Sequence, residues 1–417
     1  MSRRLATLFY LAALMLTPVS VACKFLLGAT NVVWIDPSLL LSLVVLLALL
    51  PRWEDFLDDE LRFLVAGAAV LFLASLCSAF SGALLRPPSS LYTVLREPLR
   101  LWLSLGWFLT CAWFLKHQAR TVFIGAVIAV MLGLSAGIYL ELAAFSLVPA
   151  PALAVSYART YMARQTLWFH GFPLLRMGSL FFEAPPFGLF MFSMVVVLHR
   201  LRGAVNRRIW SGVGMTAAAL GALFSLSDQV LFAGAVGVFS GLPQLAKKRP
   251  ATTWLLAFVM MIVVCVFEFQ SIDIKQASST TGVVTRINGG SVAERSFHLR
   301  YGWLLLGAHP AATLFGIGPG RYGEYAAESG DFPDTVDMQT SEMEILVEWG
   351  VAGLAAWLFL LGGLALRAAR LHGLLGLGLL VALVIADSFQ ANWKHEAAFL
   401  AIAALSITPS SMVERNV

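Results

Sequence analysis

The chain has 417 residues, of which 59% are hydrophobic and 13% are charged, and its formal net charge is +5. Soluble domains carry about 25% charged residues, so this composition excludes an ordinary soluble protein and indicates a polytopic membrane protein. The positive charge gathers mainly in short loops between hydrophobic runs, as the positive-inside rule describes. It therefore indicates topology, and we expect no nucleic-acid partner.

The hydrophobic runs approach the length of about 20 residues that crosses a bilayer. We predict an all-α polytopic fold with about twelve transmembrane helices and both chain ends in the cytoplasm, because every inner loop of this arrangement carries Lys or Arg. The predicted spans are, in chain order, Leu5–Leu27, Pro37–Leu50, Phe63–Phe80, Leu99–Leu115, Thr121–Leu147, Leu180–Leu198, Ser211–Leu226, Val230–Gln244, Thr253–Phe269, Ile345–Leu366, Leu374–Ser388 and Ala397–Ile407.

These spans divide the chain into membrane regions and two long outer loops. Residues 1–147 are N-terminal membrane helices, 148–179 an outer loop, 180–270 further membrane helices, 271–344 a large outer loop between spans nine and ten, and 345–417 C-terminal membrane helices. The four cysteines lie far apart within apolar runs. We therefore predict small buried residues there, with neither a disulfide framework nor a metal site.

The two outer loops carry many arginines on the side of the membrane that topology disfavours. A forked guanidinium pairs with phosphate or carboxylate through two hydrogen bonds, so the set favours an anion-binding site. Each arginine taken singly also fits an ion pair with an outer acidic side chain. The arginines are Arg159, Arg164, Arg176, Arg286, Arg295, Arg300 and Arg321, with Lys275 as the only lysine.

A glycine-rich turn, Gly316-Ile-Gly-Pro-Gly-Arg321, lies in the larger outer loop. Glycine accepts positive φ and proline fixes φ, so the turn can expose N–H groups of Gly318 and Gly320 as a small anion cradle. The alternative is a purely structural turn. Further on, Ser341 and Glu344 fit a helix capping box, and Gly350 with Gly353 indicates close helix packing.

These features together resemble the O-antigen ligase and polymerase family of bacterial envelope enzymes. The resemblance covers the chain loosely from about Arg176 to the C-terminus. The motifs that carry it are His309-Pro310, Gly316–Gly320, the Gly350/Gly353 pair, and a block from Arg176 to Gly188 that contains Glu183 and Pro185. Gln339 stands where ligases of the family carry histidine, and Ser227-Asp228 stands where many members have Ser-Arg, which favours a polymerase.

The resemblance implies a GT-C-like membrane body in the bacterial inner membrane, with its active site facing the periplasm. It implies transfer of an oligosaccharide from a polyprenyl diphosphate carrier to an acceptor glycan hydroxyl, without metal or other cofactor. The partners that it implies are the lipid-linked oligosaccharide, the acceptor glycan, membrane lipid and a chain-length regulator. A ligase that uses lipid A core as acceptor and a protein O-glycosylating member are the alternatives within the family.

In such a reaction the departing diphosphate gains negative charge, which arginines would stabilise. We predict Arg176, Arg295, Arg300 and Arg321 for this role, with Arg286 as a further substrate-binding cation. The acceptor hydroxyl loses a proton, a task for a carboxylate or histidine. The residues predicted for that step are Glu183, His309, Asp337 and Glu342, and Gln339 is predicted to hydrogen-bond a sugar hydroxyl or to orient the acceptor. The structural alternatives are a turn histidine before a proline for His309 and a cap of the following helix for Glu183.

Two other classes of protein remain open at this point. A secondary transporter or flippase also commonly has twelve spans, but such proteins often show internal repeats, which this sequence lacks, and a flippase is expected to place arginines within its spans. A non-catalytic subunit of a polysaccharide export complex is the other alternative. The clustering of arginines in the outer loops favours an enzyme.

Overall fold

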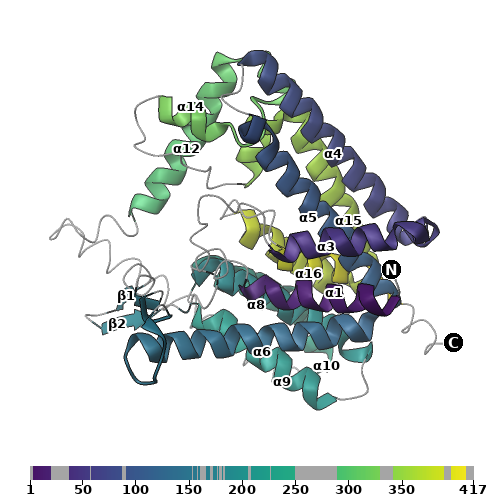
Figure 1. Cartoon of the computed structure of the whole chain (residues 1–417), viewed down its shortest axis with the longest axis vertical. Coiled ribbons are helices and arrows are strands. Elements are labelled where there is room, and N and C mark those ends of the chain that lie inside the picture. The colour runs from purple at the N-terminus through teal and green to yellow at the C-terminus, as the bar shows by residue number, and fades with distance from the viewer. Residues whose placement is uncertain are drawn as a thin grey trace.

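The computed structural model shows a largely helical membrane protein (Figure 1). We describe residues 3–19, 37–56, 58–86, 91–152, 154–156, 158–159, 166–169, 172–175, 177, 181, 184–204, 208–225, 227–248, 289–328, 341–388 and 396–409. Within these residues, the helices long and apolar enough to cross a membrane lie at Glu60–Leu85, Pro98–His117, Ala119–Ala144 and Glu342–Val384. The total of twelve spans stays a prediction, and the predicted span Thr253–Phe269 lies outside the described residues.

The first half of the chain supplies the helices that build one side of the body. They are α1 (Arg3–Leu16), the short 3-10 helix η1 (Thr17–Val19), α3 (Pro37–Leu49), the 3-10 helix η2 (Leu50–Phe56), α4 (Asp59–Leu85), α5 (Leu91–His117) and α6 (Ala119–Ala144). The α-helices contain apolar runs of this half of the chain. An apolar run in a membrane becomes helical because a helix satisfies all of its backbone hydrogen bonds within itself.

The second half adds the remaining body and an outer group of short helices. The elements are α8 (Ala184–Leu201), η4 (Arg202–Ala204), α9 (Arg208–Phe224), α10 (Asp228–Lys248), α12 (Gly289–Ala308), α13 (Ala312–Phe315), α14 (Tyr322–Glu328), α15 (Ser341–Ser388) and α16 (Glu396–Ser406). The predicted tenth and eleventh spans both lie in α15, which breaks its helical geometry at Gly350 and Gly373.

The first outer loop contains a short hairpin, although the sequence predicted helices only. Strands β1 (Thr166–Phe169) and β2 (Phe172–Leu175) are antiparallel, with Thr166 opposite Leu175 and Phe169 opposite Phe172. Threonine, tryptophan and phenylalanine favour the extended backbone of a strand, which explains why this segment departs from the surrounding helical pattern.

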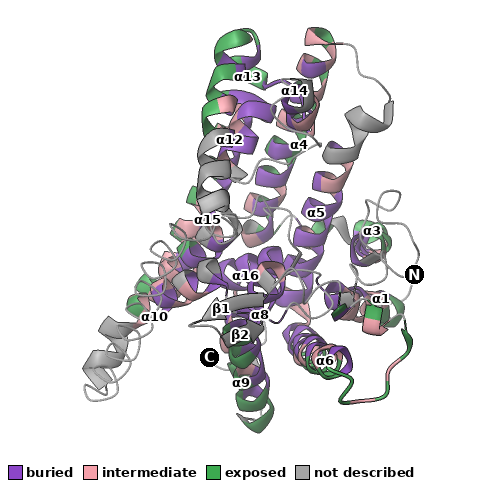
Figure 2. Cartoon of the chain, turned by 90° about the vertical axis from the view of Figure 1, so that its left-hand side faces the viewer, coloured by how far each residue is buried: buried purple, intermediate pink, exposed green. Residues whose placement is uncertain are grey.

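The core is centred on α5 (Figure 2), in which Trp107, Phe108, Trp113 and Phe114 are almost wholly buried. Tyr10 of α1 stacks on Phe114 with ring centroids 3.9 Å apart, and it lies 5.6 Å from the ring of Trp107. Helix α16 is likewise buried along its described length, whereas α9 exposes much of its surface. A bundle with a buried central helix therefore supports the outer helices.

Polar contacts join α4, α5, α15 and α16 at one end of the body. At the end predicted to be cytoplasmic, Lys116 pairs with Asp58 at 2.5 Å, and Arg367 donates to the backbone oxygens of Glu60 and Ser406 at 3.0 and 3.2 Å. The helices α12, α13 and α14 lie at the opposite end of α4, which we call the outer end (Figures 1 and 2). The outer helices share a small apolar cluster of their own with the start of α15.

Candidate functional site

The glycine-rich turn adopts the backbone that its sequence predicts. Gly316, Gly318 and Gly320 have φ of 79°, 105° and 72°, in the region that favours glycine. The turn packs directly against the break in α15 at Gly350, whose own φ is 69°. A methyl group at Gly350 would lie 2.4 Å from the carbonyl oxygen of Leu314, so the backbone approaches this glycine closely, whereas a methyl group at Gly353 would meet only Trp349 of the same helix. Close helix packing through the Gly350/Gly353 pair stays a prediction.

The break in α15 frees backbone carbonyls that then hold the turn. The N–H of Ile317 donates to the oxygen of Val347, and the N–H of Gly318 donates to the oxygen of Glu348, both at 3.0 Å. Ser78 of α4 also donates its hydroxyl to the Glu348 oxygen at 2.5 Å. The turn is therefore anchored to α15 through main-chain atoms.

The Glu348 carboxylate completes this anchoring from within α15. Its Oε2 accepts from the N–H of Gly320 at 2.7 Å, and its Oε1 accepts from the N–H of Tyr322 at 3.1 Å. The side chain is buried. Of the two N–H groups predicted to cradle a substrate anion, that of Gly320 is bonded to the Glu348 carboxylate and that of Gly318 to the Glu348 backbone oxygen, which fits the structural alternative. A substrate-binding role for Gly318 and Gly320 stays a prediction.

Arg321 is 2% exposed and links the turn to the end of α4. Its Nη1 donates to the carbonyl oxygens of Gly82 and Arg86, the latter at 2.9 Å, and its Nε pairs with Glu324 Oε2 at 3.2 Å. Its Nη2 is buried and has no hydrogen-bond partner within the described part of the chain. The Nη2 group of the guanidinium is therefore still able to donate a hydrogen bond to a ligand.

Three cationic or titratable side chains converge on the ring of Tyr325. The guanidinium carbons of Arg86 and Arg321 lie 5.6 and 5.9 Å from the ring centroid, within cation–π range. The His309 ring meets Tyr325 edge-on with centroids 5.5 Å apart. Tyr301 fixes this helix by donating its hydroxyl to the Tyr325 carbonyl oxygen at 2.7 Å. We call Arg86, His309, Arg321 and Tyr325 the Tyr325 cluster.

The cluster is accessible from the outer surface on one side. Arg86 and His309 are half-buried, whereas Arg321 and Tyr325 are buried beneath them. Arg321 pairs with Glu324, and the guanidiniums of Arg321 and Arg86 both lie against the ring of Tyr325. The cluster thus brings two arginines together, the residue type that pairs best with phosphate or carboxylate anions.

A buried histidine–tyrosine pair lies behind the turn. His298 Nδ1 and the Tyr322 hydroxyl are 2.7 Å apart, and His298 is fully buried. Burial raises the pKa of the Tyr322 hydroxyl, and the nearby Tyr301 and Glu348 raise that pKa further. Tyr322 therefore stays a neutral hydroxyl across the physiological range.

The predicted site residues fall into three groups. His309 and Arg321 come together in the Tyr325 cluster, while Arg300 is exposed on α12 and Glu342 is half-buried in the first turn of α15. Arg295 lies on α12, where only its backbone is described. The remaining predicted residues, Arg176, Glu183, Arg286, Asp337 and Gln339, lie outside the described residues, and their roles stay predictions.

Sequence reasoning missed several residues that build this region. The sequence assigns no role to Arg86, and it places Glu348 within the predicted span Ile345–Leu366. The signal for Glu348 is its place two residues before Gly350, in the motif that was already singled out. His298 and Tyr301 are three residues apart, which places them on one face of α12.

In comparisons with known proteins, no protein-family model matches the chain, and no curated protein matches it significantly.

Proposed function

We propose that the protein transfers oligosaccharide units from a polyprenyl diphosphate carrier to the hydroxyl of an acceptor glycan, as a polymerase acting at the outer surface of a bacterial inner membrane. The observation that supports this most is the Tyr325 cluster, where Arg86, Arg321 and His309 meet at the outer end of α4. A lipid-linked substrate keeps its diphosphate at the membrane surface, where this end of α4 is predicted to lie.

The reaction requires positive charge next to the leaving diphosphate, to stabilise the negative charge that develops there. The acceptor oxygen attacks the anomeric carbon, the bond from that carbon to the phosphate oxygen breaks, and the electron pair leaves with the diphosphate. In the proposal, Arg86 and the free Nη2 arm of Arg321 stabilise this charge. Exposed Arg300 draws the anionic carrier toward the surface through its long-range field.

A second requirement is a group that accepts the proton of the acceptor hydroxyl. His309 is the member of the cluster that can do this, because a neutral imidazole carries an unprotonated ring nitrogen that accepts a proton. Its ring is half-buried and held edge-on against Tyr325, so the cluster offers cation and base on one small surface.

The position of the cations favours an enzyme over a transporter. Arg86 follows the last residue of α4, and Arg321 and His309 lie between the short outer helices. A transport pathway would call for polar or ionisable groups along the inside of the spans. The charged groups of the cluster instead gather at the surface, where a lipid headgroup meets water.

The test is incubation of the purified full-length protein with one polyprenyl-diphosphate oligosaccharide, followed by separation of products by size. A ladder of whole repeats is the expected result. Transfer that occurs only after lipid A core is added would replace the polymerase by a ligase. If neither condition gives product, the glycosyltransferase proposal fails.

Variants of the Tyr325 cluster then test where the reaction occurs. Arg86→Gln is expected to lower the turnover rate by roughly a hundredfold or more, because it removes one stabilising cation. His309→Gln is expected to lower it by about 10²–10⁴-fold through loss of the base. Arg120→Gln, an exposed arginine at the opposite end of the body, is the matched control and should keep full activity. Equal activity in all three variants would rule out the cluster.

A further inference from the structure

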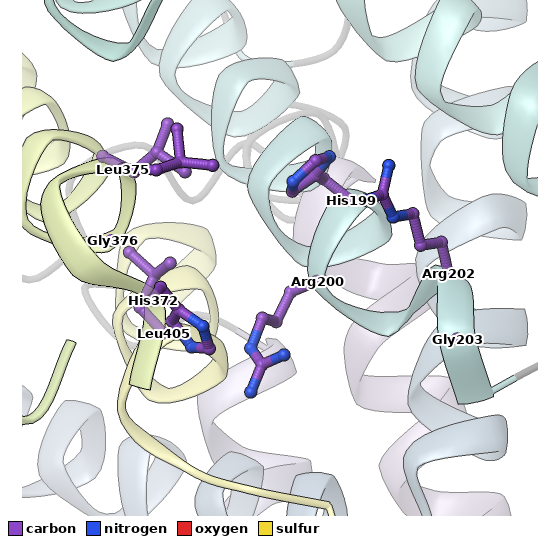
Figure 3. A pocket seen from close by; sticks show the side chains of 9 residues that line it. His199, Arg200, Arg202, Gly203, His372, Leu375, Gly376 and Leu405 are labelled. Atoms are coloured by element: carbon purple, nitrogen blue, oxygen red, sulfur yellow. The ribbon is translucent and has the colours of Figure 1, made fainter. Parts of the chain in front are cut away.

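A cavity of about 370 Å³ opens between α8, η4, α15 and α16 (Figure 3). It lies at the C-terminal ends of α8 and α16 and beside the break of α15 at Gly373, in the region that the positive-inside rule assigns to the cytoplasm, so it is separate from the Tyr325 cluster. The residues that line it are His199, Arg200, Arg202, Gly203, His372, Leu375, Gly376, Leu379 and Leu405. None of these is acidic, while two are arginines and two are histidines.

Two buried nitrogen atoms in this cavity lack protein partners. Arg200 Nε and His372 Nε2 are both shielded from solvent, and neither has a hydrogen-bond partner among the described residues. Buried polar groups are normally hydrogen-bonded, and an unmade bond is costly. Figure 3 shows Arg200 and His372 on facing elements, with His199 and Arg202 further along the α8 side. These two nitrogen atoms could therefore be satisfied by a hydrogen-bond acceptor of a bound ligand.

The backbone of α15 explains how His372 reaches this position. Gly373 has φ of 63° and breaks the helix directly after His372. Leu375 and Leu379 follow on the next turns and form an apolar wall of the same cavity. Positive side chains therefore meet apolar ones, which is the combination that a phosphate group attached to a lipid requires.

We propose that this cavity binds a phosphate group, with Arg200 and His372 as donors to its oxygens. Arginine matches phosphate geometry with forked hydrogen bonds, and an imidazole N–H supplies a further donor. The same phosphate chemistry can come from an anionic phospholipid of the inner leaflet or from a free phosphate in the cytoplasm. This site is independent of the proposed glycan transfer and does not require it.

Binding is measured on the purified full-length protein with two probes. In detergent, inorganic phosphate alone is titrated by calorimetry. In nanodiscs, native mass spectrometry counts phospholipid retained by the protein, comparing discs of phosphatidylcholine alone with discs that also contain phosphatidylglycerol. Binding of phosphate in detergent identifies a soluble source, and retention of phosphatidylglycerol without phosphate binding identifies a lipid source. If neither is bound, the proposal is overturned.

Substitutions of cavity residues test whether the phosphate group binds in this cavity. Arg200→Gln is expected to weaken binding roughly tenfold or more, because a charge-assisted hydrogen bond is lost. His372→Gln should weaken it by a smaller factor, and Arg200→Lys, which keeps the charge, should bind better than Arg200→Gln. Arg370→Gln removes an exposed arginine two residues from His372 that does not line the cavity, and it should bind as the unmodified protein does. Equal binding by Arg200→Gln and Arg370→Gln would refute the assignment.

Discussion

Replacing Glu348 by glutamine tests whether this carboxylate holds the glycine-rich turn Gly316–Arg321, called the outer turn below. Both of its oxygens accept backbone N–H groups, from Gly320 at 2.7 Å and from Tyr322 at 3.1 Å. Glutamine has the same shape but only one acceptor oxygen. In Glu348→Gln, one N–H keeps a neutral partner and the other faces the amide NH₂, which is itself a donor.

The magnitude follows from these two bonds. Hydrogen bonds to charged groups contribute about 1.5–3 kcal/mol and neutral ones about 0.5–1.5 kcal/mol, so the surviving bond weakens by about 1 kcal/mol. The orphaned N–H is buried with the turn, and leaving it unsatisfied costs about 1–3 kcal/mol. The sum is about 3 kcal/mol, which corresponds to a roughly hundredfold increase in the population of the opened turn.

Hydrogen exchange of the backbone amides measures this opening locally. Under conditions where exchange follows the opening equilibrium, the amides of Gly320 and Tyr322 should exchange roughly a hundredfold faster in Glu348→Gln than in the unmodified protein. Glu54→Gln, an exposed carboxylate in η2, is the control and should leave the turn unchanged. Unaltered exchange at these two amides in Glu348→Gln would show that the carboxylate does not hold the turn.

Three further substitutions give distinct readouts in thermal unfolding of the detergent-solubilised protein. The hydrogen bond from Lys116 lowers the pKa of the Asp58 carboxyl, with a backbone hydrogen bond assisting. Asp58→Asn should therefore lower stability by up to about 1 kcal/mol at neutral pH, and the difference should vanish as the pH falls below about 4; a difference that persists in acid would contradict this. Tyr322→Phe removes the hydroxyl that bonds a buried imidazole, so it should cost about 1 kcal/mol at neutral pH. Because burial raises the pKa of Tyr322, that variant should also lose less stability as the pH rises through about 10, where the unfolded tyrosine ionises. Gly350→Ala should cost at least about 2 kcal/mol, since the methyl group meets a carbonyl oxygen at 2.4 Å and the residue has positive φ. Gly362→Ala, in open space on the same helix, should be neutral or stabilising.

The sequence predicted local features well because they depend on neighbouring residues. Long apolar runs marked the membrane helices, and the glycines of the Gly316–Gly320 turn have the positive φ that their residue type allows. The predicted span Leu99–Leu115 agrees with the membrane-crossing part of α5 at Pro98–His117. Helix α5 itself begins earlier, at Leu91, with Pro98 inside it, because an apolar run marks the part of a helix that lies in the membrane and not the point where the helix begins.

The contacts that define the candidate site could not be predicted in the same way. Arg321 donates to the carbonyl oxygen of Gly82, a residue 239 positions earlier in the chain. No periodicity links such distant positions, and a carbonyl oxygen carries no signal in the sequence. Glu348 likewise appeared to be one acidic residue near a span, since its partners are backbone N–H groups that every non-proline residue possesses.

The outer turn has a mechanical consequence for the two helices that it touches. Arg321 donates hydrogen bonds to the carbonyl oxygens of Gly82 and Arg86 at the end of α4, while the N–H groups of Ile317 and Gly318 donate to carbonyl oxygens of α15. The turn therefore sets the angle between two helices that are long enough to cross the membrane. A bilayer of different thickness changes the tilt of such helices, so lipid thickness would act on the spacing of Arg86 and Arg321.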